Sequence, residues 1–518
     1  MSIAKIVWVD DEIESLKSQK IFLEQKGYEV QTFTNGFEAI EYIKTNTPDV
    51  VLLDETMPGV SGLETLAQIK TINQQLPAVL ITKNETENLM EEAIGSQIAD
   101  YLIKPVNPNQ VLLSLKKILD NKRLVAEKTT TAYQQEFRNL FMALNNNPNH
   151  NEWKDIYKKL VYWELEMEKS NSPEMQEVLQ SQKQEANTEF YKFISKNYAA
   201  WVQGKADRPV MSFDLLKEKV FPLLEKDKPL FFVLIDNFRF DQWKAVKSLF
   251  AEDFKVVSED MFYSILPTAT QYCRNAIFSG MMPLEIEKNF PDKWKNDEEE
   301  GGKNLFEEDF LAAYISKLQK KNIKFSYTKI VNNQDAQLLV NNIRNLLTND
   351  LNIIVYNFVD MLSHARTELE VLKELAGDEI SYRSITKSWF EHSPLKQALK
   401  KIADKNINVV LSTDHGSVKV RTPYRIIGDK QTSTNLRYKT GRNLQFNPKD
   451  GMLCKNPKEI GLPSPGLNSS YVFAKEDGFL CYPTNYNYYV NYYKNTFQHG
   501  GISMEEIMAP VIRMESKA

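Results

Sequence analysis

The chain has 518 residues, 42 % of them hydrophobic and 26 % charged, which is the composition of an ordinary globular protein with several domains. A formal net charge of −5 excludes a protein that binds nucleic acid through its bulk charge, although a local basic patch is compatible with it. The three cysteines, Cys273, Cys454 and Cys481, are far apart, which excludes a disulfide framework and a thiolate zinc site and favours a reducing compartment.

The N-terminus and the apolar runs give no sign of export or of membrane insertion. The opening MSIAKIVWVDDE carries acids where a secretory signal needs an apolar run. The longest apolar runs, 229–235 and 351–359, are much shorter than the ~20 residues of a membrane span and are typical of buried strands. We therefore expect a cytoplasmic protein without direct membrane insertion.

Short apolar runs alternate with helix-period segments through residues 1–122. The runs are 3–9, 30–33, 50–53, 78–81 and 101–103. This alternation predicts an α/β domain with a parallel sheet and helices on both of its faces. Because parallel strands bring their carboxyl ends to one edge of the sheet, the residues that follow the runs should form one site.

The residues at these strand ends suit phosphoryl transfer to a carboxylate. Asp10 and Asp11 follow the first run and Asp54 follows the third, and clustered carboxylates are ligands that Mg²⁺ prefers. Asp54 can attack a phosphoryl group as a nucleophile. Thr82 and Lys104 follow the fourth and fifth runs, where they can donate to the phosphoryl oxygens and offset their charge. We expect a cis peptide before Pro105, which would aim Lys104 inward.

This set of residues, in this order, resembles the receiver domains of two-component response regulators over the whole of residues 1–122. The resemblance implies a flavodoxin-like sheet with strand order 2-1-3-4-5, a cognate sensor histidine kinase, and Asp54 as the phosphoacceptor. It also implies that Mg²⁺ is bound by Asp10, Asp11, Asp54 and Thr56. The residues of the conformational switch would be Thr82, Tyr101 and Lys104. Lys83 stands where receivers usually carry a small residue, so we expect altered autodephosphorylation.

Residues 123–205 change in character. They are rich in Glu, Lys and Gln, and turn signals at 145–149 and 170–173 separate helix-period segments. Trp153, Tyr157, Leu160, Val161 and Leu165 form an apolar stripe at helical spacing. We interpret this region as a helical-bundle linker, and the alternative is a helix dedicated to binding a partner.

The α/β alternation returns in residues 206–518, with strand candidates at 230–235, 352–358 and 407–412 and polar insertions at 292–303 and 417–461. Aspartate, histidine and threonine motifs follow these strands: Asp236, Thr268, Thr270, Asp360, His364, Asp414, His415 and His499. Mixed Asp/His ligation suits zinc or manganese. Two such metals can clamp the attacking and leaving oxygens of a phosphoryl displacement, and a metal activates a threonine hydroxyl. His150 and His392 match no motif and are expected to be structural.

The order of these motifs resembles the alkaline phosphatase superfamily, most closely its PglZ branch, whose style of opening appears at 236–243 as DNFRFDQW. The resemblance implies one Zn²⁺ held by Asp236, Asp414 and His415 with Thr270 as nucleophile and ligand, and a second held by Asp360, His364 and His499. Thr268 is the rival nucleophile. A receiver joined through helices to a PglZ domain resembles regulators of type IX secretion, which implies secretion-motor or sigma-factor partners and no sequence-specific DNA binding.

A basic stretch follows His415, and we expect it to bind substrate phosphates through Arg421, Arg425, Arg437 and Lys439. Tyrosines between 486 and 493 could stack bases. The alternatives are a solvated loop for the basic residues and strand packing for the tyrosines.

These features predict a phosphodiesterase for nucleotides or short oligonucleotides, linear or cyclic. We expect phosphorylation of Asp54 to shift the surface near residues 85–120 and to promote a symmetric homodimer. The alternative is a signalling adaptor with little turnover, and the retained Thr270 favours the enzyme. A transcriptional regulator is disfavoured, because the sequence shows no recognition helix with clustered base-reading residues.

Overall fold

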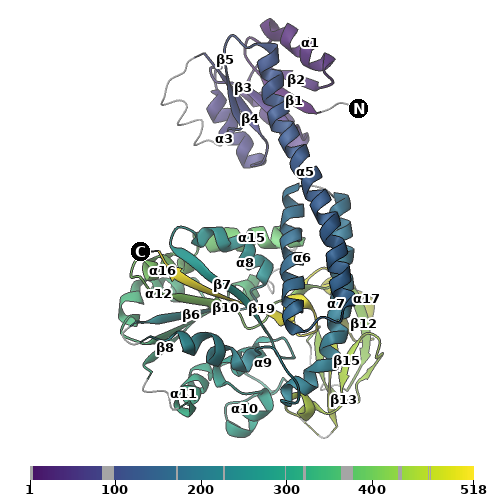
Figure 1. Ribbon diagram of the computed structural model, residues 1–518, viewed down its shortest axis with the longest axis vertical. Helices are drawn as coiled ribbons and strands as arrows, with labels where there is room; N and C mark the ends of the chain where they lie inside the picture. Colours follow the sequence, from purple (N-terminus) through teal and green to yellow (C-terminus); the bar gives the residue numbers. More distant parts are fainter. Residues whose placement is uncertain are drawn as a thin grey trace. The chain divides into compact units, whose positions relative to one another are not determined.

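The computed structural model describes residues 4–83, 98–170, 173–225, 228–297, 299–318, 323–362, 377–429, 435–464, 466 and 468–517, without the side chains of 120–128, 170 and 173 (Figure 1). The chain forms two compact units, one of residues 1–134 with 170–172 and the other of residues 135–169 with 173–518. Each unit is described by itself. Within the described residues, no helix has both the length and the apolar character that crossing a bilayer requires.

The first unit contains a five-stranded parallel sheet of order β2-β1-β3-β4-β5, which confirms the expected receiver topology. Its strands are β1 (Lys5–Val9), β2 (Glu29–Phe33), β3 (Val50–Asp54), β4 (Ala78–Thr82) and β5 (Asp100–Ile103). Its helices are η1 (Ile13–Leu16), α1 (Lys17–Gln25), α2 (Gly36–Thr45), α3 (Gly62–Ile72) and the start of α5 (Pro108–Asn145).

Successive residues of the central strands feed two separate cores, one on each face of this sheet. Ile6 and Trp8 of β1 pack in the same core as Leu23 of α1 and Val111 of α5. Val7 lies in the other core, among side chains of α2 and α3. Because both faces are covered, the central strands are nearly continuous apolar runs, and their polar residues are concentrated at the strand ends.

The linker consists of long helices that belong to the second unit, together with the end of α5. These helices are α6 (His150–Ser170) and α7 (Pro173–Val202), and they lie side by side in Figure 1. The expected apolar stripe is largely buried, since Trp153 and Tyr157 are each only 1 % exposed. Trp153 contacts Phe190 of α7 with ring centroids 5.2 Å apart, and Tyr157 contacts Phe240 of the larger α/β domain at 6.1 Å. This stripe therefore packs the linker against the domain that follows it.

The larger α/β domain is built on a six-stranded mixed sheet of order β7-β19-β10-β6-β9-β8. Its strands are β6 (Leu230–Ile235), β7 (Phe254–Tyr263), β8 (Phe325–Ile330), β9 (Leu351–Tyr356), β10 (Val409–Ser412) and β19 (Met508–Ser516). β10, β6, β9 and β8 run parallel, whereas β19 is antiparallel to β10 and to β7. The carboxyl ends of β6, β9 and β10 therefore meet at one edge of the sheet.

Helices cover both faces of this sheet. Figure 1 shows α8 and α15 on one face and α9 and α11 on the other. The helices of the second unit after α7 are η2 (Ser212–Asp214), η3 (Leu216–Val220), η4 (Phe221–Leu223), α8 (Phe240–Val246), η5 (Lys247–Phe250), α9 (Thr270–Ser279), α10 (Pro283–Asn289), α11 (Glu307–Lys317), α12 (Asn333–Leu346), α15 (Glu379–His392), α16 (Pro394–Ala403), η6 (Pro457–Ile460), α17 (Tyr486–Tyr493) and α18 (Met504–Ile507).

The insertion expected at 417–461 and the chain that follows it form short strands instead of one open loop. These are β11 (Val418–Lys419), β12 (Thr422–Ile427), β13 (Tyr438–Arg442), β14 (Gln445–Phe446), β15 (Gly451–Cys454), β16 (Ser469–Ala474), β17 (Gly478–Cys481) and β18 (Phe497–Gln498). The tyrosine-rich segment is helix α17, and its tyrosines are exposed or half-buried. Strand packing, the alternative considered for these tyrosines, is therefore wrong.

Candidate active site

The carboxyl edge of the receiver sheet brings three carboxylates together. One oxygen each from Asp10, Asp11 and Asp54 lie within 4.8 Å of one another. The Lys104 ammonium is 2.9 Å from Asp10 Oδ2 and 3.0 Å from Asp54 Oδ2. The Lys104–Pro105 peptide is cis, as expected. Burial raises the pKa of Asp54, with the neighbouring Asp10 adding to it, so a bound cation would favour the ionised form of this carboxylate.

The other receiver residues lie around this cluster. The Thr82 hydroxyl donates a hydrogen bond to Glu55 Oε2 at 2.6 Å, and the Tyr101 side chain is 44 % exposed. Lys83 and Thr56 are exposed. Residues 85–97, which are part of the surface expected to switch near 85–120, lie outside the described residues. The roles assigned to Thr56, Thr82 and Tyr101 stay predictions.

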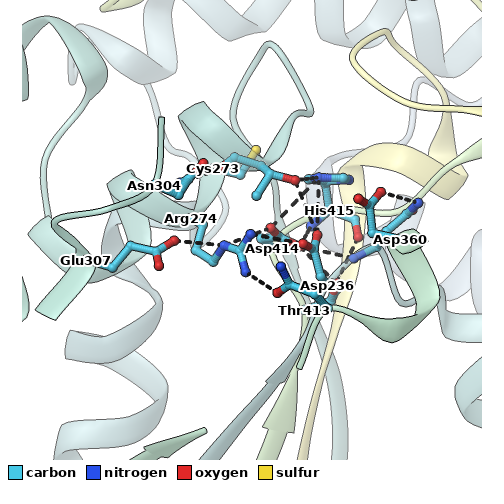
Figure 2. Close-up of polar contacts among 12 residues, drawn as sticks. Asp236, Cys273, Arg274, Asn304, Glu307, Asp360, Thr413, Asp414 and His415 are labelled. Carbon is cyan, nitrogen blue, oxygen red and sulfur yellow. Dashed lines mark hydrogen bonds and ion pairs between the residues drawn. The ribbon is translucent and has the colours of Figure 1, made fainter. Parts of the chain in front are cut away.

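A second cluster lies at the carboxyl edge of the larger sheet, drawn in Figure 2. Asp236 directly follows β6, and Asp414 and His415 follow β10, which is the neighbouring parallel strand. One ligand atom each from Asp236, Asp414 and His415 lie within 4.8 Å of one another, and all three residues are buried. The strand ends thus bring together residues that are far apart in the sequence.

Two more of the expected ligands border this cluster. His499 Nε2 is 3.7 Å from Asp360 Oδ1, and the His499 ring stacks on that of His415 with centroids 4.3 Å apart. Asn237 donates from Nδ2 to Asp360 Oδ1 at 3.3 Å, from a backbone with a φ of 60°. The remaining predicted ligand, His364, lies outside the described residues. Asp360 and His499 therefore adjoin the buried cluster, as a second metal position would require.

Thr270 and Thr268 have different surroundings. Thr270 is the first residue of α9, and its Oγ1 is 3.3 Å from Asp236 Oδ1 and 3.1 Å from His415 Nε2. Thr268 is fully buried, where its hydroxyl donates to Gly501 O at 3.0 Å and accepts from Gly500 N at 3.0 Å. Thr270 therefore borders the carboxylate and imidazole cluster, whereas Thr268 is bonded to the loop after His499.

The donor set fits a divalent metal. His415 donates from Nδ1 to Gly416 O at 3.0 Å, which leaves the lone pair of Nε2 for a cation, and burial lowers the pKa of His415. Among the described residues, Asp414 Oδ2 is buried without a hydrogen-bond donor. Burial raises the pKa of Asp236, and the neighbouring Asp414 and Asp360 raise it further. A bound cation would compensate for this concentrated negative charge, and carboxylate with imidazole is a usual zinc set.

The site also contains residues that sequence reasoning missed. Arg274 of α9 donates from Nη2 to Asp236 Oδ2 at 2.9 Å and pairs through Nε with Glu307 at 2.9 Å and with Asp414 at 3.7 Å (Figure 2). Asn304 donates to the Thr270 carbonyl at 3.2 Å. Arg274 stands one helical turn after Thr270, so helical spacing could have indicated it. The sequence holds no comparable signal for Glu307 or Asn304.

The expected substrate-binding residues fall into two groups. Arg425 is exposed and its guanidinium lies 5.0 Å from the centroid of the Tyr486 ring, while Arg421 is half-buried. Arg437, by contrast, is fully buried and pairs with Glu506 at 2.5 Å. Lys439 is 1 % exposed, and burial lowers its pKa to about 7. The structure thus differs from the expectation for Arg437 and Lys439, because Lys439 in β13 and Arg437, which directly precedes that strand, both have buried side chains.

Known families match the chain in three consecutive segments. Residues 6–116 match the response regulator receiver domain, and residues 123–202 match the PorX response regulator linker domain. Residues 215–514 match the BREX system PglZ alkaline phosphatase-like domain, which is more than half of the 518 residues. The chain belongs to the PglZ alkaline phosphatase-like family. With a receiver and the PorX linker before the PglZ domain, it is a PorX-type response regulator, and its receiver implies a cognate histidine kinase.

Individual relatives match this PorX-type regulator over a segment of receiver length. It is 35 % identical over 120 residues to the phosphoglycerate transport system transcriptional regulatory protein PgtA of Salmonella typhimurium, covering 23 % of this chain and 29 % of that protein. It is 31 % identical over 124 residues to the alkaline phosphatase synthesis transcriptional regulatory protein PhoP of Bacillus subtilis, covering 24 % of this chain and 51 % of that protein.

Among solved structures, a CheY-like receiver domain protein from Methanospirillum hungatei is 28 % identical with a TM-score of 0.23, covering 23 % of this chain and 96 % of that chain. For the PorX-type regulator, the alkaline phosphatase-like domain together with the buried Asp236, Asp414 and His415 favours a metal-dependent hydrolase.

Proposed function

We propose that this PorX-type regulator is a phosphodiesterase for nucleotides or short oligonucleotides, linear or cyclic, whose activity is controlled by phosphorylation of Asp54. The observation that carries the proposal is the position of the Thr270 hydroxyl, 3.1 Å from His415 Nε2 and 3.3 Å from Asp236 Oδ1 within a buried carboxylate and imidazole cluster. A pure binding fold does not need a hydroxyl nucleophile at this position.

The proposal assigns two Zn²⁺ ions to the site, with Mn²⁺ as the alternative. Asp236, Asp414 and His415 would hold one and Asp360, His364 and His499 the other. When bound, such ions lower the pKa of a coordinated hydroxyl and neutralise charge on the phosphoryl oxygens.

The chain's own groups would then perform the displacement. Thr270 Oγ1 would lose its proton and attack phosphorus, and the P–O bond to the leaving alcohol would break as that alcohol takes up a proton. Water would later hydrolyse the resulting nucleotidyl ester of Thr270, which releases a phosphate monoester and regenerates the hydroxyl. Thr270 opens α9, so the amino end of that helix adds positive potential where phosphate charge accumulates. Arg274 contacts Asp236 Oδ2, and this leaves Asp236 Oδ1 directed toward Thr270.

Diester and oligonucleotide substrates are suggested by the cationic and aromatic residues that follow His415 in the chain. Arg421 and Arg425 border the loop that follows His415, and Arg425 lies against Tyr486 of α17. Exposed tyrosines such as Tyr488, which is 65 % exposed, can stack on bases of any sequence. The proposal also includes a role in protein secretion, with secretion-motor or sigma-factor components as partners. That role rests on the sequence resemblance.

The test compares zinc-loaded wild type with Thr270→Ala on bis-p-nitrophenyl phosphate and on short linear and cyclic oligonucleotides. Thr348→Ala, which changes an exposed threonine of the same unit, is the matched control. We expect Thr270→Ala to lose turnover while it retains zinc, and Thr348→Ala to behave as wild type. Equal rates for wild type and Thr270→Ala would reject the nucleophile. Zinc binding without turnover in any of them would favour the adaptor.

Metal stoichiometry tests the two-metal arrangement independently of turnover. Asp360→Ala and His499→Ala should each lose about one metal per chain, because each removes a donor from the same ion. Wild type that binds a single zinc, or variants that retain two, would contradict the assignment of Asp360 and His499 to a second ion.

A further inference from the structure

Helix α7 of the linker contains two buried polar residues that contact the short helix α18 of the larger α/β domain. Lys183 is 8 % exposed, and its ammonium lies 2.6 Å from Glu164 Oε2 of α6 and 3.6 Å from Glu505 Oε1 of α18. One turn along α7, Asn187 donates to Glu505 Oε2 at 3.0 Å and accepts from the Met504 amide at 2.8 Å. These contacts fix both a side chain and a backbone amide of α18.

Helix α18 in turn holds the two loops that carry the histidines of the site. Gly416, next to His415, donates its amide to Glu506 O at 3.1 Å. A Cβ on Gly416 would lie 2.1 Å from Glu505 O, so this close approach requires glycine. Gly501, in the loop after His499, donates its amide to Glu506 Oε1 at 2.9 Å. Both histidine loops are therefore hydrogen-bonded to Glu506 of this short helix.

A second set of contacts joins the linker to the same region. Glu164 of α6 accepts from Arg383 at 2.9 Å, and the same Arg383 nitrogen is 2.9 Å from Asp241. Asp241 accepts from Arg239 at 2.9 Å and 2.6 Å. Arg239 also donates to the carbonyl of Ser417 at 3.3 Å. These contacts thus connect Glu164 of the linker to the loop that follows His415.

Attachment of the linker does not need these charges. Trp153, Tyr157 and Phe190 already pack the helices onto the fold through aromatic contacts. Buried ion pairs contribute little net stability compared with apolar side chains of similar size, although they specify one geometry when every partner is present. The geometry specified here is that of the His415 and His499 loops.

We propose that the linker is part of the metal centre's support, with Lys183 and Asn187 as positioning residues that set the placement of His415 and His499 through α18. The inference rests on the proposed metal site. Groups that orient metal ligands from outside change metal affinity by about 10- to 100-fold when they are removed. A displacement of α7 would therefore alter metal binding and turnover without touching a ligand.

The linker helices also give this support a connection to the receiver. Helix α5 begins at Pro108 in the first unit and ends at Asn145 in the second. Near its end, the Phe137 carbonyl accepts from Gln182 of α7 at 3.0 Å, and Gln182 is the neighbour of Lys183. A movement of α5 would thus reach α7 beside the residue that contacts α18.

The experiment measures zinc affinity by competition with a chromophoric chelator, a readout that needs no substrate. Lys183→Gln and Asn187→Ala should weaken zinc binding by about 10- to 100-fold, and Lys183→Arg should restore part of it. Lys192→Ala, which removes an exposed lysine of the same helix, should bind zinc as wild type does. Asn187→Ala leaves every charge in place. If Lys183→Gln does not fold, the zinc affinity of Asn187→Ala is sufficient to test the inference.

Two other results would overturn the inference. Unchanged zinc affinity in Asn187→Ala, with only a lower melting temperature, would assign these residues to packing. A weakened affinity in Lys192→Ala equal to that of Lys183→Gln would show a general charge effect. If wild type binds no zinc, it is the proposed function that fails, and that outcome is separate from both.

In the folded variants, kcat for bis-p-nitrophenyl phosphate should fall more than KM rises, because the histidines and not the substrate contacts are displaced.

Discussion

Thr270 Oγ1 lies 3.1 Å from Nε2 of His415, although 145 residues separate the two in the chain. Thr270 stands at the start of α9 and His415 follows β10, so the contact depends on the α/β fold as a whole. Thr268, only two residues earlier, bonds to the backbone of Gly500 and Gly501 instead. The extended backbone of Ala269, with φ −137° and ψ 145°, separates the two hydroxyls.

This contrast between the threonines predicts two different phenotypes. Thr270→Ala should lower kcat by about three to six orders of magnitude, as for a catalytic nucleophile, with little change in melting temperature. Thr268→Val should lower the free energy of unfolding by about 1–3 kcal/mol for each backbone group of Gly500 and Gly501 left without a partner. Calorimetry and diesterase assays on both variants measure this, and the reverse pattern would make Thr268 the nucleophile.

Arg274 should be essential for stability of the metal-free site. Arg274→Met leaves Asp236, Asp414 and Glu307 without their shared cation, and breaking such a buried pair costs about 3–5 kcal/mol. Saturating zinc should recover part of the lost melting temperature, because a bound cation stabilises the same carboxylates. Differential scanning calorimetry with and without zinc measures both effects. Arg344→Met, a change at an exposed arginine, is the control, and an equal loss there would refute the argument.

The receiver fold and the two clusters of candidate metal ligands could be predicted from the sequence because both depend on strand ends. A parallel sheet brings its carboxyl ends to one edge whatever lies between the strands, so Asp54 and Asp236 could be placed before any distance was known. The residues that support them, such as Glu307, follow from how α9 and α11 pack. No local pattern of residue types specifies that packing.

The basic stretch after His415 shows where sequence reasoning failed. Arg425 and Arg437 look equivalent in the sequence, yet Arg425 is exposed and Arg437 is paired with Glu506. The difference arises because Arg437 directly precedes β13, where its carbonyl accepts from the amide of Ala474 in β16 and its side chain meets Glu506 of α18, which lies much later in the sequence. Charge composition predicts that a cationic surface exists, whereas tertiary pairing decides which residues form it.

Phosphorylation of Asp54 should change the oligomeric state. In the wild type, a small-molecule phosphoryl donor with Mg²⁺ should raise the mass in sedimentation from monomer to dimer, and Asp54→Asn should remain monomeric. Asp49→Asn is the control, since Asp49 is exposed at the amino end of the same strand, away from the carboxylate cluster. Mass spectrometry verifies that the wild type is phosphorylated. An unchanged sedimentation mass of the phosphorylated wild type would reject the predicted dimer.

Lys439 should make stability depend on pH in a defined window. Its ordinary pKa is 10.5 and burial lowers it to about 7 in the folded chain. Between these values the unfolded chain carries a proton that the folded chain lacks, so the contribution of Lys439 to stability rises with pH from about 7 to 10.5 and is constant below about 7.

Lys439→Met removes this proton linkage and keeps most of the side-chain volume. At pH 6 the variant should be more stable than wild type, by an amount of the order of a few kcal/mol, and the difference should shrink as the pH approaches 10. Denaturant unfolding at several pH values measures the difference, with Lys449→Met as the control at an exposed lysine of the same segment. If the difference is the same at every pH, Lys439 is protonated in the folded chain, and its burial is compensated by contacts that hold the ammonium form.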